Sequence, residues 1–182
     1  MKRLALLLLA VLASGCATWG APGRLAQLAL PAPQQLDCCW QSRERVQITT
    51  PGETLTLDAA VALTSGPLTL VAFDGLGRRL VALSHSGGAP QTLQAPAGWS
   101  TALSHQLLLA LYLHHLAPAA WQFADPDWSV TAEDDLRVLR HRGRELVRLR
   151  YLAQDSAQAG REIDYIGQDI RLSVHSLSRT EL

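Results

Sequence analysis

The sequence predicts a mainly β protein with one α-helix (α+β), in which a curved antiparallel sheet, or half-open β-barrel, holds an apolar helix on its concave side. Three observations predict this fold. Short apolar or alternating segments, separated by turn residues, make up most of the chain after residue 36. Residues 101–116 contain no Gly or Pro and carry apolar side chains on nearly every side of a helix. The strands come in runs before and after this one helix, which favours an antiparallel sheet.

Four strands are expected before the helix. Residues 45–49 and 54–58 alternate apolar and polar side chains on either side of the turn Pro51-Gly52, a pattern typical of strands with one buried face. Residues 68–73 are apolar on both faces, and residues 80–83 return after the turn Asp74-Gly75-Leu76-Gly77. These two segments predict a hairpin. Because both of its faces are apolar, we expect another element to cover the second face.

Residues 101–116 form the predicted helix. Ser100 is a good N-cap, and Pro118 ends the segment. The few polar residues, among them the pair His114-His115, fall on nearly every side of a helical wheel. A helix without a polar face is expected to be buried on most sides.

Strands resume after the helix. Apolar side chains alternate along the last segments, and turns such as His141-Arg142-Gly143-Arg144 and Gly167-Gln168 separate neighbouring ones. The expected strands are residues 128–131, 136–139, 145–152, 160–165 and 170–174.

Residues 1–15 have the layout of a secretory signal peptide. Lys2 and Arg3 precede an apolar run from Leu4 to Leu12, and small residues follow it. A run of about nine residues is much shorter than the roughly 20 that a membrane-spanning helix needs. The alternatives are a signal peptide that is cleaved elsewhere or a short buried helix.

The segment Ala13-Ser14-Gly15-Cys16 resembles the lipobox of bacterial lipoproteins, although that family usually has Leu in place of Ala13. The resemblance implies that Cys16 becomes the N-terminal residue and carries covalent acyl chains; no other cofactor is expected. Acyl chains would anchor the protein without a transmembrane helix. Ala17 stands where an Asp would retain a lipoprotein in the inner membrane, which implies the periplasmic face of the outer membrane.

The domain boundaries follow from this N-terminus. Residues 16–35 are expected to comprise the lipidated Cys16 and a flexible tether, since they are rich in Ala, Pro and Gly. Arg24 to Leu30 could form a turn or two of helix at most. Residues 36–182 are then a single domain.

Composition argues against several classes of function. The formal net charge is zero at pH 7, whereas nucleic-acid binders rely on a basic surface. Three Cys residues are too few for a disulfide scaffold. The adjacent Cys38 and Cys39 could form a disulfide, but one buried and one exposed thiol is favoured, because neighbouring residues of a strand face opposite sides.

No metal centre and no enzymatic activity are predicted. The histidines lack the spacing of zinc ligands, and no Gly-x-Ser-x-Gly motif occurs. His85 lies between two serines, and Asp125-Pro126-Asp127 offers paired carboxylates, but both segments are typical of solvated turns. The arginines of residues 137–150 could contact lipid headgroups, yet acidic neighbours favour an ion-paired, solvated strand face.

Several segments resemble a known family. They are Pro67-Leu68-Thr69-Leu70 with Phe73-Asp74, the helix around Leu107 to Tyr112, and Gly143 to Tyr151. Together with the lipobox and the tether they resemble LolB, and more closely the uncharacterised LolB-like lipoproteins, a domain-of-unknown-function family often associated with aryl polyene biosynthesis genes. The resemblance covers about residues 36–177. It implies a half-open barrel of the LolB/LolA type whose cavity holds an acyl chain.

The resemblance therefore implies a lipid-anchored outer-membrane protein that binds or transfers an acylated molecule, either a lipoprotein or a lipid-like cargo. A LolA-like periplasmic carrier is the expected partner, and the protein is expected to be a monomer. Leu76 is the predicted membrane-contact tip. The cavity is expected to be lined by Leu70, Ala72, Leu107, Leu111, Leu149 and Tyr151. The alternative is a well-packed core in a structural or interaction lipoprotein of an envelope assembly, without a cavity ligand.

Overall fold

The computed structural model describes residues 23–152 and 160–182. These residues form one antiparallel sheet of ten strands and one α-helix, α2 (Thr101–His115). The strands lie side by side in the order β5-β4-β3-β2-β1-β10-β9-β8-β7-β6. Their bounds are β1 Trp40–Thr50, β2 Glu53–Leu63, β3 Leu68–Phe73, β4 Arg79–His85, β5 Gln91–Gln94, β6 Trp128–Glu133, β7 Leu136–His141, β8 Arg144–Tyr151, β9 Gly160–Tyr165 and β10 Ile170–Glu181.

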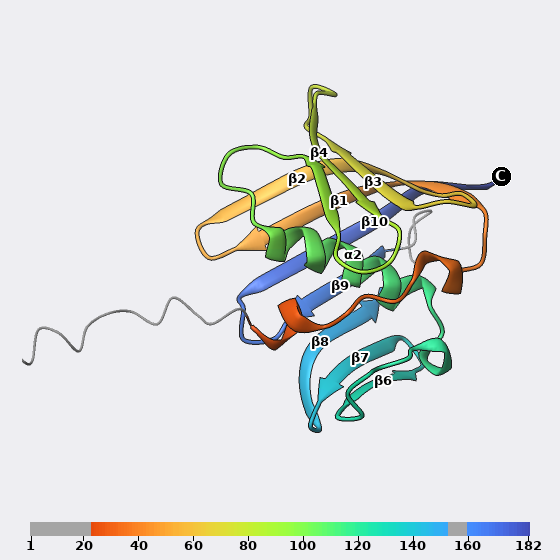
Figure 1. Cartoon of the computed structure of the whole chain (residues 1–182). Helices are drawn as coiled ribbons and strands as arrows, with labels where there is room; N and C mark the ends of the chain where they lie inside the picture. The colour runs from red at the N-terminus through yellow and green to blue at the C-terminus, as the bar shows by residue number, and fades with distance from the viewer. Residues whose placement is uncertain (1–22, 153–159) are drawn as a thin grey trace, which may run out of the picture.

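The sheet curves around α2 but does not close (Figure 1). β5 and β6 are its two edges. The first strand, β1, lies at the centre and pairs with both β2 and β10, so that Val46 stands opposite Leu57 and Val174. All three side chains are buried on the concave side. The predicted fold, a curved and half-open antiparallel sheet, is confirmed.

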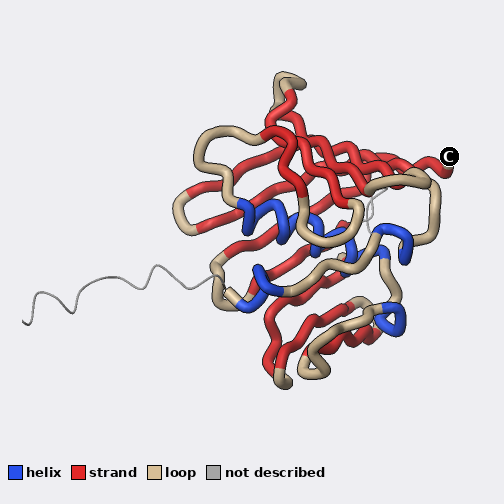
Figure 2. Tube along the Cα trace, in the orientation of Figure 1, coloured by secondary structure: helices blue, strands red, loops and turns tan. Residues whose placement is uncertain are grey.

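The helix α2 lies on the concave side of the sheet (Figure 2). The Ser100 side chain accepts a hydrogen bond from the Leu103 N–H at 3.1 Å, which confirms the predicted N-cap. Leu108, Leu109 and Tyr112 are completely buried, as expected for a helix without a polar face. Among the described residues, no helix is long and apolar enough to cross a membrane.

Four parts of the sheet were not predicted from the sequence pattern: β5, the start of β1, and the later parts of β2 and β10, which extend beyond the expected residues 54–58 and 170–174. β5 contains no apolar alternation and pairs only with β4. β1 begins at Trp40, five residues before the predicted strand. The sequence pattern missed these residues because Ser42 and Glu44 occupy inward positions that usually carry apolar side chains. The alternation that indicates a half-buried strand is therefore interrupted.

Residues 24–36, here called the strap, pack against the domain instead of forming a tether. The strap contains two short 3-10 turns, η2 (Arg24–Gln27) and η3 (Pro33–Gln35), and runs beside α2 (Figures 1 and 2). Its leucines are buried in the same core as α2: Leu25, Leu28, Leu30 and Leu36. The prediction of a flexible tether is thus wrong for residues 24–35, since burial of these leucines outweighs the Pro-rich composition. Cys16, the leader and residues 17–22 lie outside the described residues.

Cys38 and Cys39 form a disulfide. The expectation of one buried and one exposed free thiol is therefore wrong. The pair lies before β1 in irregular chain, where the alternation of a strand does not apply.

Candidate functional site

The interior beneath α2 is filled by side chains. The residues predicted to line a cavity come from three elements around it: Leu70 and Ala72 from β3, Leu107 and Leu111 from α2, and Leu149 and Tyr151 from β8. The fold brings them into one core, in which five are buried and Tyr151 packs against the rest. None of them lines any of the five main hollows of the described structure. The protein's own core occupies this interior.

A cluster of buried polar side chains, here called the polar cluster, lies at the C-terminal end of α2 and closes the interior there. Arg161 on β9 donates a hydrogen bond to Glu44 on β1 at 2.8 Å, and both side chains are almost completely buried. Arg137 on β7 turns inward, and its Nη1 donates to the carbonyl oxygens of Leu113, His114 and Leu116 at 2.6–3.1 Å. This arginine therefore caps the helix end, where carbonyls lack helical partners.

His114 and His115 belong to the same polar cluster. The Nδ1 of His114 lies 3.2 Å from the Tyr151 hydroxyl, and Arg179 donates to the Nδ1 of His115 at 3.2 Å. Burial, aided by the positive charge of Arg161, lowers the pKa of His114 to about 2 and that of His115 to about 3. Both imidazoles are therefore neutral at pH 7.

The arginines of β7 and β8 divide between two environments. On the outer face, Arg140 and Arg148 both pair with Glu145, which matches the predicted ion-paired strand face. Arg137 instead points into the polar cluster under the helix. The sequence pattern did not reveal this difference.

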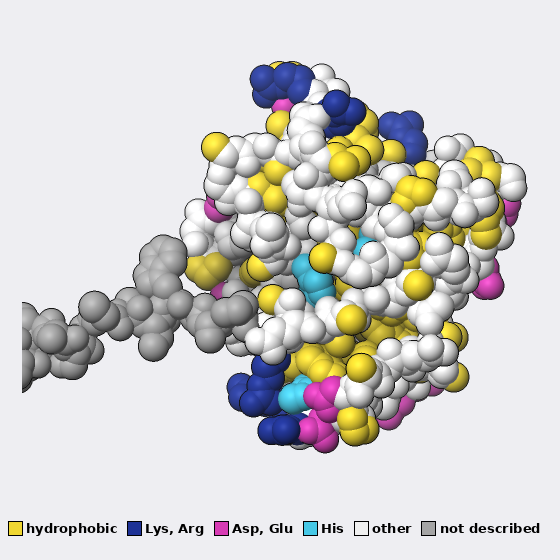
Figure 3. All heavy atoms as spheres, in the orientation of Figure 1, with side chains coloured by type: hydrophobic (Ala, Val, Ile, Leu, Met, Phe, Trp, Pro, Cys, Tyr) yellow, Lys and Arg dark blue, Asp and Glu magenta, His cyan; other side chains and the backbone are white. Residues whose placement is uncertain are grey.

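Leu76 stands at the tip of the turn between β3 and β4. Asp74 Oδ1 accepts hydrogen bonds from the backbone N–H groups of Leu76 and Arg78, each at 2.9 Å, and Gly77 adopts a φ of 76°. The turn is thus held by its own residues, while the Leu76 residue is left 82% exposed. Arg78 and Arg79 are exposed beside it, and basic side chains gather at this projecting hairpin in Figure 3. An apolar tip next to cations suits contact with a membrane surface.

A hollow of about 360 Å³ lies beside α2 and is here called the strap pocket. Leu25 and Ala26 of the strap form one wall, and the loop after β4 contributes Ala89 and Pro90. The opposite wall comes from the first turns of α2, including Ala102, His105 and Gln106. No charged side chain is among the residues that line it. The pocket lies on the flank of the helix, away from the interior where the sequence placed a cavity.

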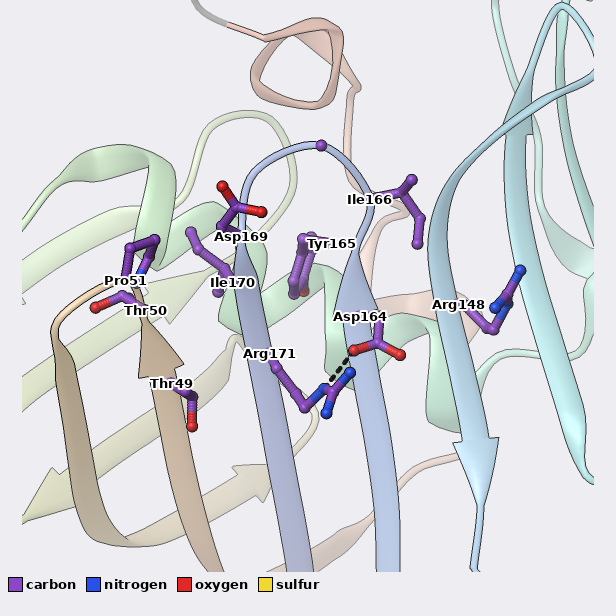
Figure 4. A pocket seen from close by; sticks show the side chains of 11 residues that line it. Thr49, Thr50, Pro51, Arg148, Asp164, Tyr165, Ile166, Asp169, Ile170 and Arg171 are labelled. Atoms are coloured by element: carbon purple, nitrogen blue, oxygen red, sulfur yellow. Dashed lines mark hydrogen bonds and ion pairs between the residues drawn. The ribbon is translucent and has the colours of Figure 1, made fainter.

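Another hollow, of about 600 Å³, lies at the ends of β1, β9 and β10 (Figure 4). The most prominent interaction there is the ion pair in which Arg171 donates to Asp164 at 2.6 Å. The two charges already neutralise each other, so this hollow offers little to a charged ligand.

Asp125, Asp127 and His141 place ligand-type atoms within 4.8 Å of one another. Each of the three side chains is already engaged by the protein. Arg24 of the strap donates to the Nδ1 of His141 at 2.8 Å, so the Nε2–H of His141 donates to Asp125 at 3.1 Å. Arg142 donates to Asp127 at 2.7 Å. The hydrogen bond between Arg24 and His141 therefore ties the strap to β7.

A family model described as "Protein of unknown function (DUF3261)" matches residues 41–178, which is well over half of the chain. The chain belongs to the DUF3261 family. A search of curated proteins finds no match. The prediction of an uncharacterised domain-of-unknown-function family is confirmed at this level.

The DUF3261 match begins in β1 and ends in β10. It therefore includes the strands from β2 to β9 and all of α2, but not the strap. The strap pocket lies where the matched DUF3261 domain meets a segment outside the match.

Proposed function

We propose that this DUF3261 protein is a lipid-anchored outer-membrane protein, facing the periplasm, that binds an acylated molecule and passes it to the membrane. The observation that carries the proposal is Leu76, an exposed leucine at the tip of a self-supported turn with two arginines beside it. Inserting one leucine into hydrocarbon is worth about 1.5–3 kcal/mol. A basic residue near an anionic surface adds about 1 kcal/mol, a contribution expected of Arg79, whereas the charge of Arg78 is balanced by its ion pair with Asp74 at 2.7 Å.

The proposed roles divide among three parts of the chain. Acyl chains on Cys16 hold the protein at the membrane, because several chains together give a stable anchor. The β3–β4 hairpin touches the bilayer through Leu76. The acylated cargo, delivered by a LolA-like periplasmic carrier, binds in an apolar hollow of the domain.

His85 and His105 have partners that support a structural role for both side chains. Within the described residues, neither His85 nor His105 has a serine or carboxylate partner. His85 bonds the Tyr112 hydroxyl at 2.8 Å and the Gly88 carbonyl at 3.1 Å. The Nε2–H of His105 donates to the Leu28 carbonyl at 2.8 Å. Both imidazoles thus connect parts of the core and lack the arrangement that activates a nucleophile.

A second candidate is a structural or interaction lipoprotein of an envelope assembly. The filled interior favours it, since the residues expected to line a cavity are packed into the core. This role needs no lipid ligand, so ligand binding separates the two candidates.

The test has three measurements. Native mass spectrometry of protein extracted from membranes is expected to show a lipid adduct beyond the anchor, and a fluorescent monoacylglycerol is expected to bind. A Cys16→Ala protein is then mixed with vesicles of phosphatidylethanolamine and phosphatidylglycerol. Leu76→Ser is expected to reduce flotation with the vesicles about tenfold.

Leu93→Ser is the matched control, because Leu93 is another exposed leucine, on the edge strand β5. Equal flotation of the Leu76→Ser and control proteins would remove the membrane role of the hairpin. Absence of both an adduct and binding of the fluorescent monoacylglycerol would leave the interaction lipoprotein as the better account.

A further inference from the structure

The strap pocket is a surface hollow whose lining combines apolar atoms with uncharged polar groups. Apolar atoms make up most of its lining surface, and Leu25, Ala89, Pro90 and Ala102 are among the residues that contribute them. The polar members are hydroxyl, amide and imidazole groups. Its volume of about 360 Å³ is at the lower end of the range of about 300–1,000 Å³ for small-molecule sites. The pocket therefore suits one narrow, uncharged, amphiphilic ligand.

Two lining residues carry hydrogen-bond acceptors that lack partners among residues 23–152 and 160–182. His105 and Gln106 are buried, with only 8% and 3% of their surfaces exposed. The His105 Nε2–H donates to Leu28, so its Nδ1 is an acceptor, and this atom has no partner. Gln106 donates through Nε2 to Gln168, while its Oε1 has no partner. An unpaired buried acceptor costs about 1–3 kcal/mol, so a ligand that donates to one of them recovers part of that free energy.

The lining offers an anionic head no cationic side chain to pair with. None of the lining residues is Lys or Arg. Burial also lowers the pKa of His105, which keeps its imidazole neutral at pH 7. At His105 Nδ1 and Gln106 Oε1 a carboxylate would meet acceptors, and no positive side chain of the lining would offset the loss of its hydration.

We propose that the strap pocket binds a single acyl chain whose head is neutral and donates a hydrogen bond, such as the hydroxyl of an acyl glycerol or the N–H of an acyl amide. This inference rests on the proposed function, because it names the site and the ligand class for the acylated cargo. The chain lies against Leu25 and Ala102, and the head donates to His105 or Gln106. The strap thereby becomes a wall of the ligand site.

The probes are three molecules with the same ten-carbon chain: decanol, decyl methyl ether and decanoate. Each pair is offered in competition to the lipidated full-length protein at pH 8, and occupancy is read by native mass spectrometry. Decanol is expected to bind at least fivefold better than the ether, which cannot donate, and at least tenfold better than decanoate.

Two variants test the position of the site. Ala102→Trp fills the pocket from an exposed helix position and is expected to reduce decanol binding at least tenfold. The matched control is Gln27→Trp, because Gln27 is an exposed strap residue that does not line the pocket. Its decanol binding is expected to equal that of the wild type. Unchanged thermal melting of both variants shows that each is folded.

A third variant tests the acceptor. His105→Gln keeps an N–H in reach of the Leu28 carbonyl but removes the unpartnered Nδ1. At least one of this variant and Gln106→Met is expected to lose most of the preference for decanol over the ether, while both melting temperatures stay within a few degrees of the wild type. An unchanged preference in both His105→Gln and Gln106→Met would overturn the role of the acceptors.

The remaining outcomes separate this inference from the proposed function. If decanol binds but Ala102→Trp has no effect, the site is elsewhere and the inference fails while the proposed function stands. If decanoate binds as well as decanol, the neutral-head assignment fails. If none of the probes binds the wild type, the proposed function fails with it.

Discussion

Glu44 and Arg161 show how one pair of side chains shapes the interior. Their ion pair lies inside the barrel, and the two residues are 117 positions apart in the sequence. Desolvation makes such a pair a modest contributor to stability, but loss of one partner would leave an uncompensated charge. No local sequence pattern indicates a pairing over this separation in the sequence. At the sequence level Glu44 only interrupts an alternating strand, so the polar end of the interior could not be predicted.

The neighbouring histidines make stability depend on pH. Above pH 6.5, imidazoles are neutral in both the folded and the unfolded chain. Below pH 6.5 the unfolded chain binds protons, while His114 and His115 stay neutral down to about 2 and 3. The free energy of unfolding is therefore expected to decrease as the pH falls, by about 1.4 kcal/mol per pH unit for each such histidine. Urea titrations between pH 6.5 and 5 measure this slope.

The variant His114→Asn isolates one contribution to that slope. His85 and His105 also have lowered pKa values because of burial, so the wild-type slope combines several groups. The variant is expected to lose about 1.4 kcal/mol per pH unit of slope relative to the wild type. The same slope in both proteins would mean that His114 is protonated in the folded state.

Among the elements, predictability follows the local pattern. β2 and β3 alternate or are continuously apolar, and α2 has a clear cap and no breaker, so their positions follow from sequence. β5 is short and polar, and only its pairing with β4 makes it a strand. The strap is the reverse case. Its Pro and Ala content is typical of a linker, but its leucines are buried in the same core as α2. The apolar surface that they contact is formed by elements distant in the sequence, so no local pattern indicates it.

The strap gives a prediction at this scale. Leu30 is buried and does not line the strap pocket. Leu30→Ala is expected to lower the free energy of unfolding by about 2–5 kcal/mol, as for other buried leucines. Gln27→Ala, at an exposed position of the same segment, is expected to change it by less than about 0.5 kcal/mol. Chemical denaturation of both variants gives the comparison, and equal values would restore the view of this segment as a tether.

For the whole molecule, the fold was more predictable than the site. The six residues expected around a cavity do surround the interior beneath α2. Whether such an interior is hollow depends on the summed volumes of side chains from many elements, including Leu25 and Leu28 of the strap. A pattern of apolar positions reveals which side chains face inward, but not whether they leave space. The strap pocket depends on the strap's docked position and was therefore not foreseeable.

The anchor is tested on the whole protein. Cys16→Ala removes the residue that would carry the acyl chains, and the protein is expected to move from the membrane fraction to the soluble fraction after cell lysis. Fractionation with immunoblotting measures the distribution. Cys38→Ala serves as the control for loss of a cysteine and is expected to stay in the membrane fraction. Retention of the Cys16→Ala protein in that fraction would disprove the lipid anchor.

The central pair of the sheet has a consequence for synthesis. β1 pairs with β10 along its length, with Trp40 opposite Glu181, so the middle of the sheet cannot form until nearly all of the chain is available. Pairings of such long range make folding slow. A chain that emerges with its N-terminus first can therefore pair β1 with β10 only when its synthesis is nearly complete. The order of the strands thus delays closure of the sheet around its helix until the last strand is available.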